Sequence, residues 1–203
     1  MISKEIGSVM IGVDMQNDFC PGGSLAVPHG DEVISPFNTM AEITRNQGGI
    51  VVFTRDWHPA NTSHFDKWPP HCIADTQGAD FHANLVVKAN DLIISKGIGA
   101  DEDGYSGFDG KTNAGETLES IILSEAYKHN KIAIFVGGLA TDYCVKATVL
   151  DALKISHDLG DKSLGVIALR HCMRAVNLHP DDEEKALAEM REAGVLWGEP
   201  IGG

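Results

Sequence analysis

The stretch IAIFVGGLATDYCVKAT, residues 132–148, decides how this chain folds. Its first five residues are continuously apolar, which is typical of a strand buried on both faces of a parallel sheet. Two glycines follow, and Thr141 is then predicted to be the N-cap of a helix that runs to His157. A strand, a short turn and a helix in this order form the repeating unit of an α/β domain.

The same unit recurs along the 203 residues of the chain. Further buried strands are predicted at 9–13, 50–54, 92–95 and 164–169, and helices at 32–47, 114–129, 141–157 and 181–193. The alternation predicts a doubly wound α/β fold, in which helices flank both faces of a mostly parallel sheet. We expect a single domain over residues 1–203. An irregular segment at 56–90 interrupts the alternation of strands and helices, and such segments in compact domains are usually functional.

The composition and net charge of the chain indicate which kinds of molecule the protein can bind. The chain has 16 Lys and Arg against 29 Asp and Glu, a net charge of −13. Such a surface repels nucleic acid and anionic lipid, and it mildly favours a neutral or cationic substrate. No apolar run approaches the roughly 18 residues of a membrane helix, and the N-terminus lacks the pattern of a secretory signal. We therefore expect a cytoplasmic protein that acts on a small molecule, with a sheet edge that allows homo-oligomers.

Chemically competent side chains follow the predicted strands. Asp14 and Lys96 each come directly after a strand, and Cys144 lies in the first turn of the helix after strand 132–136. Ligands bind at the carboxyl ends of the strands in such sheets. A helix N-terminus and a nearby lysine lower the pKa of a thiol, and free N–H groups of that turn can hold an oxyanion. These residues predict a cysteine nucleophile with two partners. The alternative is that Cys144 is a small buried residue of a core helix.

A second cluster predicts a metal site. Asp56 and His58 follow strand 50–54, and His64 and His71 lie in the irregular segment, so three of the nine histidines fall between residues 58 and 71. A carboxylate with two or three imidazoles suits one divalent ion, with Zn²⁺ first and Fe²⁺ or Mn²⁺ as alternatives. The competing interpretation is a surface loop that simply contains histidine.

Seven segments carry a family resemblance. They are VDMQNDFCPGGSLAV at 13–27, TRDWHPANTSHF at 54–65, WPPHC at 68–72, GADFH at 78–82, SKG at 95–97, YSGF at 105–108 and GLATDYCVKAT at 138–148. In this order they resemble the nicotinamidase (pyrazinamidase) branch of the isochorismatase-like cysteine hydrolases. The first and last segments are typical of the whole superfamily. The letters DWH and PPHC are typical of its metal-binding branch.

The resemblance implies a role for each reactive residue. Cys144 is expected to be the nucleophile, Asp14 the general base and acid, and Lys96 the cation that orients both. The Leu139–Ala140 peptide is expected to be cis and to aim the backbone amides of Ala140 and Cys144 at the oxyanion.

The resemblance also implies the ligands of the metal and of the substrate. Asp56, His58 and His71 are expected to bind the metal, with His64 or a water as the fourth ligand. The flat substrate ring is expected to contact Phe19, Trp68, Tyr105 and Leu139. Alternatively, Phe19 and Tyr105 are packing residues and Trp68 anchors a loop.

The implied reaction is the hydrolysis of nicotinamide to nicotinate and ammonia, a step of NAD salvage, with pyrazinamide as a second substrate and no organic cofactor. The nearest alternative is a related cysteine amidohydrolase acting on a ureido or carbamoyl substrate. A different class is a metal-binding or interaction domain without activity, which the intact Asp14, Lys96 and Cys144 disfavour.

Overall fold

The computed structural model describes residues 6–198, so the first and last five residues of the predicted domain lie outside the described part. Within it, six strands form one sheet in the order β3-β2-β1-β4-β5-β6, and every neighbouring pair is parallel. The strands are β1 (Ile6–Val13), β2 (Ile50–Asp56), β3 (Leu92–Lys96), β4 (Lys131–Leu139), β5 (Ser163–Arg174) and β6 (Leu196–Gly198). The predicted parallel α/β sheet is therefore confirmed.

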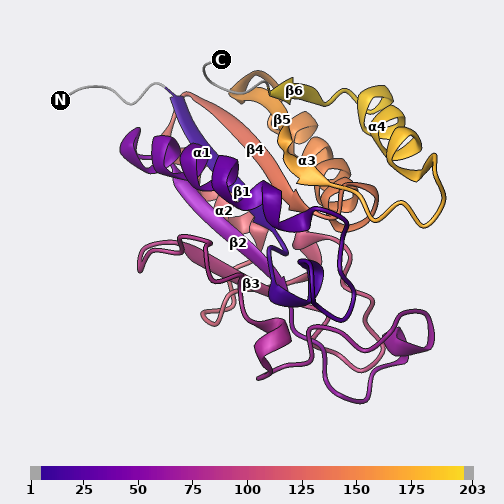
Figure 1. Ribbon diagram of the computed structural model, residues 1–203. Helices are drawn as coiled ribbons and strands as arrows, with labels where there is room; N and C mark the ends of the chain where they lie inside the picture. Colours follow the sequence, from indigo (N-terminus) through magenta and orange to yellow (C-terminus); the bar gives the residue numbers. More distant parts are fainter. Residues whose placement is uncertain (1–5, 199–203) are drawn as a thin grey trace.

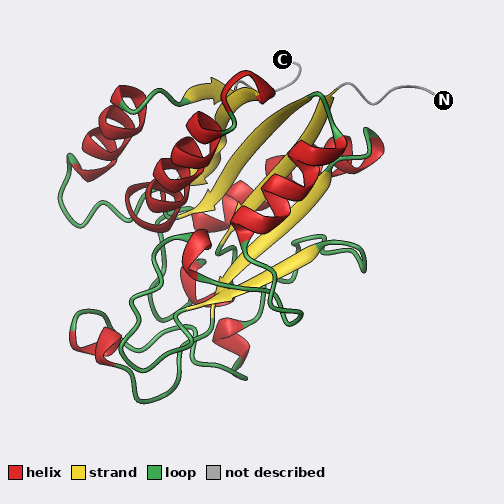
Figure 2. Cartoon of the chain, turned by 180° about the vertical axis from the view of Figure 1, so that it is seen from behind, coloured by secondary structure: helices red, strands yellow, loops and turns green. Residues whose placement is uncertain are grey.

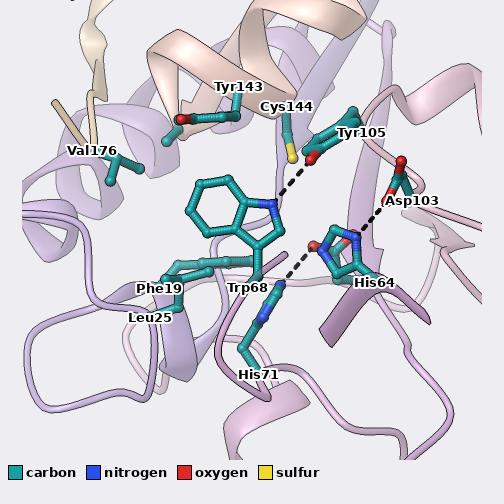
Figure 3. A pocket seen from close by; sticks show the side chains of 12 residues that line it. Phe19, Leu25, His64, Trp68, His71, Asp103, Tyr105, Tyr143, Cys144 and Val176 are labelled. Atoms are coloured by element: carbon teal, nitrogen blue, oxygen red, sulfur yellow. Dashed lines mark hydrogen bonds and ion pairs between the residues drawn. The ribbon is translucent and has the colours of Figure 1, made fainter. Parts of the chain in front are cut away.

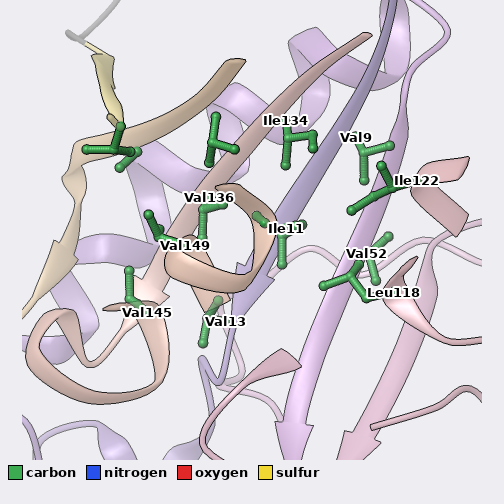
Figure 4. Packing of buried hydrophobic residues seen from close by; sticks show 14 of the residues in the cluster. Val9, Ile11, Val13, Val52, Leu118, Ile122, Ile134, Val136, Val145 and Val149 are labelled. Carbon is green, nitrogen blue, oxygen red and sulfur yellow. The ribbon is translucent and has the colours of Figure 1, made fainter. Parts of the chain in front are cut away.

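Helices cover both faces of the sheet, as the doubly wound fold requires (Figure 1). The helices are α1 (Ile34–Asn46), α2 (Leu118–Lys128), α3 (Lys146–Asp158) and α4 (Asp182–Glu192). Side chains that alternate along β1 point to opposite faces, so Ile11 packs with α2 and α3 whereas Met10 packs with α1. Figure 4 shows the first of these clusters, where Leu118 and Val149 lie over the strands. The two apolar layers fix the sheet between the helices and leave the strand ends open.

Several predicted boundaries need correction. The helix predicted at 32–47 begins only at Ile34, after a 3₁₀ turn at Gly30–Val33, and the helix predicted from 114 begins at Leu118 because Thr117 caps it. Strand β6 was not predicted, since its three residues are too few to show a pattern. The helix predicted from Thr141 begins as a π-helical turn, described below.

The carboxyl ends of the strands open onto a layer of loops, which lies beyond the arrowheads in Figure 2. The irregular segment runs through this layer and contains only short 3₁₀ turns, such as Ser63–Asp66. It folds back on itself at a bridge between His58 and Ile73, just after the end of β2, while Phe81 bridges to Gln16, just after the end of β1. Residues far apart in sequence therefore meet at this edge. None of the helices within residues 6–198 combines the length and hydrophobicity needed to cross a bilayer.

Candidate active site

Asp14, Lys96 and Cys144 meet at the carboxyl end of the sheet. The Nζ of Lys96 lies 2.7 Å from Oδ2 of Asp14 and 3.6 Å from Sγ of Cys144. All three side chains are buried, and Lys96 and Asp14 have no exposed surface at all. The ammonium also donates to the carbonyl of Gly104 at 2.7 Å. The structure thus brings together the three residues that the sequence selected as a nucleophile and its partners.

Burial shifts the pKa of the acid and of the thiol in the same direction. Desolvation raises the pKa of Asp14 to about 6, against the opposing field of Lys96. Desolvation also raises the pKa of Cys144 well above its ordinary value, although Lys96 lowers it. The predicted net lowering of the Cys144 pKa is therefore wrong, because full burial outweighs the nearby cation. A thiol whose pKa is raised needs a base before it can act as a nucleophile, and a carboxylate oxygen of Asp14 lies within 4.8 Å of Sγ of Cys144.

The turn that carries Cys144 differs from an ordinary helix start. The Leu139–Ala140 peptide is cis, as expected. Residues Thr141–Val145 form a π-helical turn in which the amide of Val145 donates to the carbonyl of Ala140 at 3.1 Å. Ala140 occupies the N-cap position, and the buried hydroxyl of Thr141 makes no capping hydrogen bond, which corrects the predicted cap. The wide turn sets Cys144 and Ala140 side by side on the wall of one pocket.

Three buried histidines form a cluster that fits a divalent metal ion. One ring nitrogen each of His58, His64 and His71 lies within 4.8 Å of the others. Each ring bonds an oxygen through Nδ1, so its lone pair is left on Nε2. The buried Nε2 of His58 has no hydrogen-bond partner, and such an orphaned acceptor suits a metal ligand. Burial lowers the pKa of both His64 and His71, which keeps these rings in the neutral form that metals bind.

Asp56 lies between the histidine cluster and the group of Asp14, Lys96 and Cys144. Its Oδ2 lies 3.7 Å from Nε2 of His58 and 3.9 Å from Nε2 of His71, and its Oδ1 accepts from Lys96 at 2.5 Å. Burial alone raises the pKa of this carboxyl, but Lys96 and His58 together hold that pKa below its ordinary value. The ionised carboxylate completes a donor set of one oxygen and three nitrogens, a chemistry typical of zinc or iron sites.

A small pocket, with a cavity volume of about 40 Å³, lies between the two groups. Phe19, Trp68 and Tyr105 line it together with Cys144, and Figure 3 shows the sulfur and the rings of His64 and His71 around the Trp68 indole. The indole N–H donates to the hydroxyl of Tyr105 at 3.0 Å. A flat apolar ring fits these walls. Leu139, which was predicted to contact the substrate, instead lies fully buried in the core cluster of helix α1.

Comparison with known proteins identifies the family. Residues 8–197 match the isochorismatase domain family. The chain belongs to the isochorismatase family. It is 35% identical to the nicotinamidase of Escherichia coli over 90% of each chain. It matches the structure of the pyrazinamidase of Pyrococcus horikoshii in complex with zinc with a TM-score of 0.80 and 37% identity, over 95% of this chain and 98% of that one. A structure of an L. infantum protein in complex with nicotinate gives a TM-score of 0.78 and 31% identity, over 98% and 95%.

The isochorismatase-family pocket of this chain also contains residues that sequence reasoning missed. They are Leu25, Asp103, Tyr143 and Val176. Tyr143 packs its ring edge-on against Trp68 with 4.9 Å between centroids. Its place one residue before Cys144 was a signal that could have been used. Val176 gave no such signal, because it reaches the pocket only through a loop after β5.

That loop is held by a buried carboxylate. Oδ1 and Oδ2 of Asp142 accept the amides of Val176 and Asn177, each at 2.9 Å. Two main-chain hydrogen bonds to one ionised group fix the loop at the pocket mouth. Asp142 therefore contributes to this isochorismatase-family site without facing the pocket.

Proposed function

We propose that this chain is a nicotinamidase, a metal-dependent cysteine amidohydrolase that converts nicotinamide and water to nicotinate and ammonia. We propose pyrazinamide as a second substrate and NAD salvage as the setting. The observation that carries the proposal is the meeting of two groups in one buried pocket. Cys144 lines the pocket with the buried Asp14 and Lys96 behind it, and His64 and His71 of the histidine cluster line it as well. The similarity to the E. coli nicotinamidase over nearly the whole chain supports the same substrate.

The first half of the reaction forms a thioester. Asp14 removes the proton of the Cys144 thiol, and the thiolate attacks the carboxamide carbon of the substrate. The negative charge moves to the carboxamide oxygen, which the backbone amides of Ala140 and Cys144 would stabilise, since both residues line the pocket. The carbon–nitrogen bond then breaks. Asp14 returns its proton to the leaving nitrogen, so ammonia departs neutral and an acyl group remains on the sulfur.

The second half regenerates the enzyme. Asp14 takes a proton from a water molecule, whose oxygen attacks the thioester carbon. The carbon–sulfur bond breaks, Asp14 returns the proton to the thiolate, and the product acid gives up its carboxyl proton to solvent and leaves as nicotinate. A carboxyl with a pKa of about 6 suits both transfers, since it accepts and returns protons near neutral pH. Lys96 holds Asp14 by the 2.7 Å ion pair and stabilises the thiolate from 3.6 Å.

The metal site serves the substrate ring in this proposal. Asp56, His58 and His71 would hold the ion, with His64 or a water as the fourth ligand. When bound, the ion supplies a positive field and a coordination position for the pyridine nitrogen. The zinc in the related P. horikoshii pyrazinamidase favours Zn²⁺ over Fe²⁺ or Mn²⁺ here. Phe19 and Trp68 flank the ring, and Tyr105 fixes the indole of Trp68 through its hydroxyl.

The proposal also covers the location of the protein, its partners and its oligomeric state. We infer a cytoplasmic enzyme of one domain that binds neither nucleic acid nor a membrane. The net charge of −13 supports both exclusions and also favours a neutral substrate such as nicotinamide. Homo-oligomers are compatible with the open edges of the sheet at β3 and β6.

An ammonia-release assay tests the proposal. Nicotinamide, pyrazinamide and a set of N-carbamoyl amino acids are supplied to the purified protein with and without a chelator. We expect rapid release from the two pyridine-type carboxamides, loss of that release after chelation, and recovery on addition of Zn²⁺. Faster turnover of the N-carbamoyl compounds, or turnover of nicotinamide that the chelator leaves unchanged, would contradict the proposed function.

A further inference from the structure

The three histidines of the cluster differ in what holds their second nitrogen. Nδ1 of His58 bonds the carbonyl of Gly97 at 2.9 Å, and Nδ1 of His71 bonds the carbonyl of Pro69 at 2.7 Å. Nδ1 of His64 instead bonds a side chain, Oδ1 of Asp103, at 2.9 Å. Two rings are thus fixed by the main chain, while the orientation of His64 depends on one replaceable residue.

The carboxylate of Asp103 determines which tautomer the His64 ring adopts. An ionised carboxylate only accepts hydrogen bonds, so the proton of neutral His64 must sit on Nδ1. Its lone pair is then on Nε2, the nitrogen left to face His58 and His71 in the cluster. The bond also fixes the plane of the ring, which stacks on His58 with 4.6 Å between centroids and 18° between planes.

Asp103 is itself held in place. Nζ of Lys67 lies 3.0 Å from its Oδ1 and 2.7 Å from its Oδ2. The Asp103 side chain is 35% exposed and lies at the pocket wall, whereas the His64 ring is 3% exposed. The pair therefore connects solvent to the buried cluster, and Figure 3 shows Asp103 on the side of His64 away from Trp68.

We propose that Asp103 is a positioning residue of the metal site, which fixes His64 as the fourth ligand and so sets how tightly the ion is bound. The proposal rests on the metal-dependent function above. It adds that His64, rather than a water, completes the donor set. A partner of this kind typically contributes about 10–100-fold in metal affinity, because it orients the ring and raises the basicity of the ligating nitrogen.

The test measures metal affinity directly. Metal-free wild type, Asp103→Ala and Asp101→Ala compete with a chromophoric chelator for Zn²⁺, and thermal melts confirm that each variant is folded. Asp101 is an exposed carboxylate in the same loop, so its removal changes the local charge equally without touching His64. We expect Asp103→Ala to weaken Zn²⁺ binding by about 10–100-fold, and Asp101→Ala to remain within about twofold of the wild type.

A second background separates an effect through His64 from an effect of charge. In the His64→Ala protein, removing Asp103 as well should change the Zn²⁺ affinity by no more than about twofold. An equal loss in both backgrounds, or no loss from Asp103→Ala alone, would overturn the proposal.

A nitrogen–proton correlation spectrum of the metal-free wild type supplies a test that needs no variant. It should show the His64 proton on Nδ1, and a proton on Nε2 would overturn the proposal. None of these readouts uses nicotinamide, so they stand even if a different substrate is found.

Discussion

Replacing Lys96 by methionine tests the buried charge arrangement most severely. Lys96 contacts Asp14 at 2.7 Å and Asp56 at 2.5 Å, and all three side chains are at most 5% exposed. Methionine fills a similar volume but leaves two carboxylates without their cation. Removing one partner of a buried ion pair costs about 3–5 kcal/mol, so we expect the free energy of unfolding to fall by about that amount near pH 8.

The loss should depend on pH in a defined direction. Lys96 lowers the pKa of Asp14, whereas burial and the charge of Asp56 raise it, so the substitution raises that pKa above the value of about 6. A carboxyl whose pKa is raised in the folded state takes up a proton more readily there than in the unfolded chain. Its penalty therefore shrinks as pH falls and grows as pH rises. The deficit of Lys96→Met should be smaller at pH 5 than at pH 8.

Urea unfolding of the metal-free proteins at the two pH values measures this effect, since bound metal would add its own stabilisation. Lys111→Met, which removes an exposed lysine, is the matched control and should stay within about 0.5 kcal/mol of the wild type. A Lys96→Met protein as stable as the control at pH 8, or a deficit relative to the wild type that is larger at pH 5 than at pH 8, would refute the reasoning.

Three further outcomes follow from the site. Asp14 must be ionised to act as a base, and its pKa is raised to about 6. The value of kcat/KM should therefore be flat above that pH and fall about tenfold per pH unit below it. A pH–rate profile that is flat down to pH 4 would exclude Asp14 as the base. Trp68→Ala removes contacts with the substrate ring worth about 0.5–1.5 kcal/mol, so KM for nicotinamide should rise roughly two- to tenfold. An unchanged KM in steady-state assays would show that the substrate ring does not bind against Trp68. Asp142→Ala removes the hydrogen bonds that the amides of Val176 and Asn177 donate to Asp142. Urea unfolding should therefore show that the free energy of unfolding falls by about 1.5–3 kcal/mol, and KM should rise more than kcat falls. Unaltered stability would show that the loop is held by other contacts.

The sequence predicted the sheet well because its strands are buried on both faces and therefore continuously apolar. Five of the six strands found within residues 6–198 were predicted, each shorter than observed, since strands such as β5 continue into polar residues that a run of apolar letters excludes. The order of strands in the sheet and the short β6 depend on packing between distant segments. The π-helical turn before α3 likewise has no local signature, and Thr141 was therefore assigned a capping role that it does not have.

The sequence predicted those site residues that end a strand or directly follow one. Asp14, Asp56 and Lys96 end or follow parallel strands, so their meeting is a consequence of the fold. The raised pKa of Cys144 was not predictable, because it depends on complete burial that local sequence does not reveal. Asp103 was missed for a related reason: only the folded loop brings it within 2.9 Å of His64.

The central claim is that Cys144 is the nucleophile that releases ammonia from nicotinamide. Ammonia release by Cys144→Ala, measured beside the wild type with the metal content of both proteins determined, tests it most directly. The substitution removes the sulfur but none of the proposed metal ligands. We predict that ammonia release is abolished while the protein binds as much metal as the wild type. Full release by Cys144→Ala at equal metal content would contradict the account.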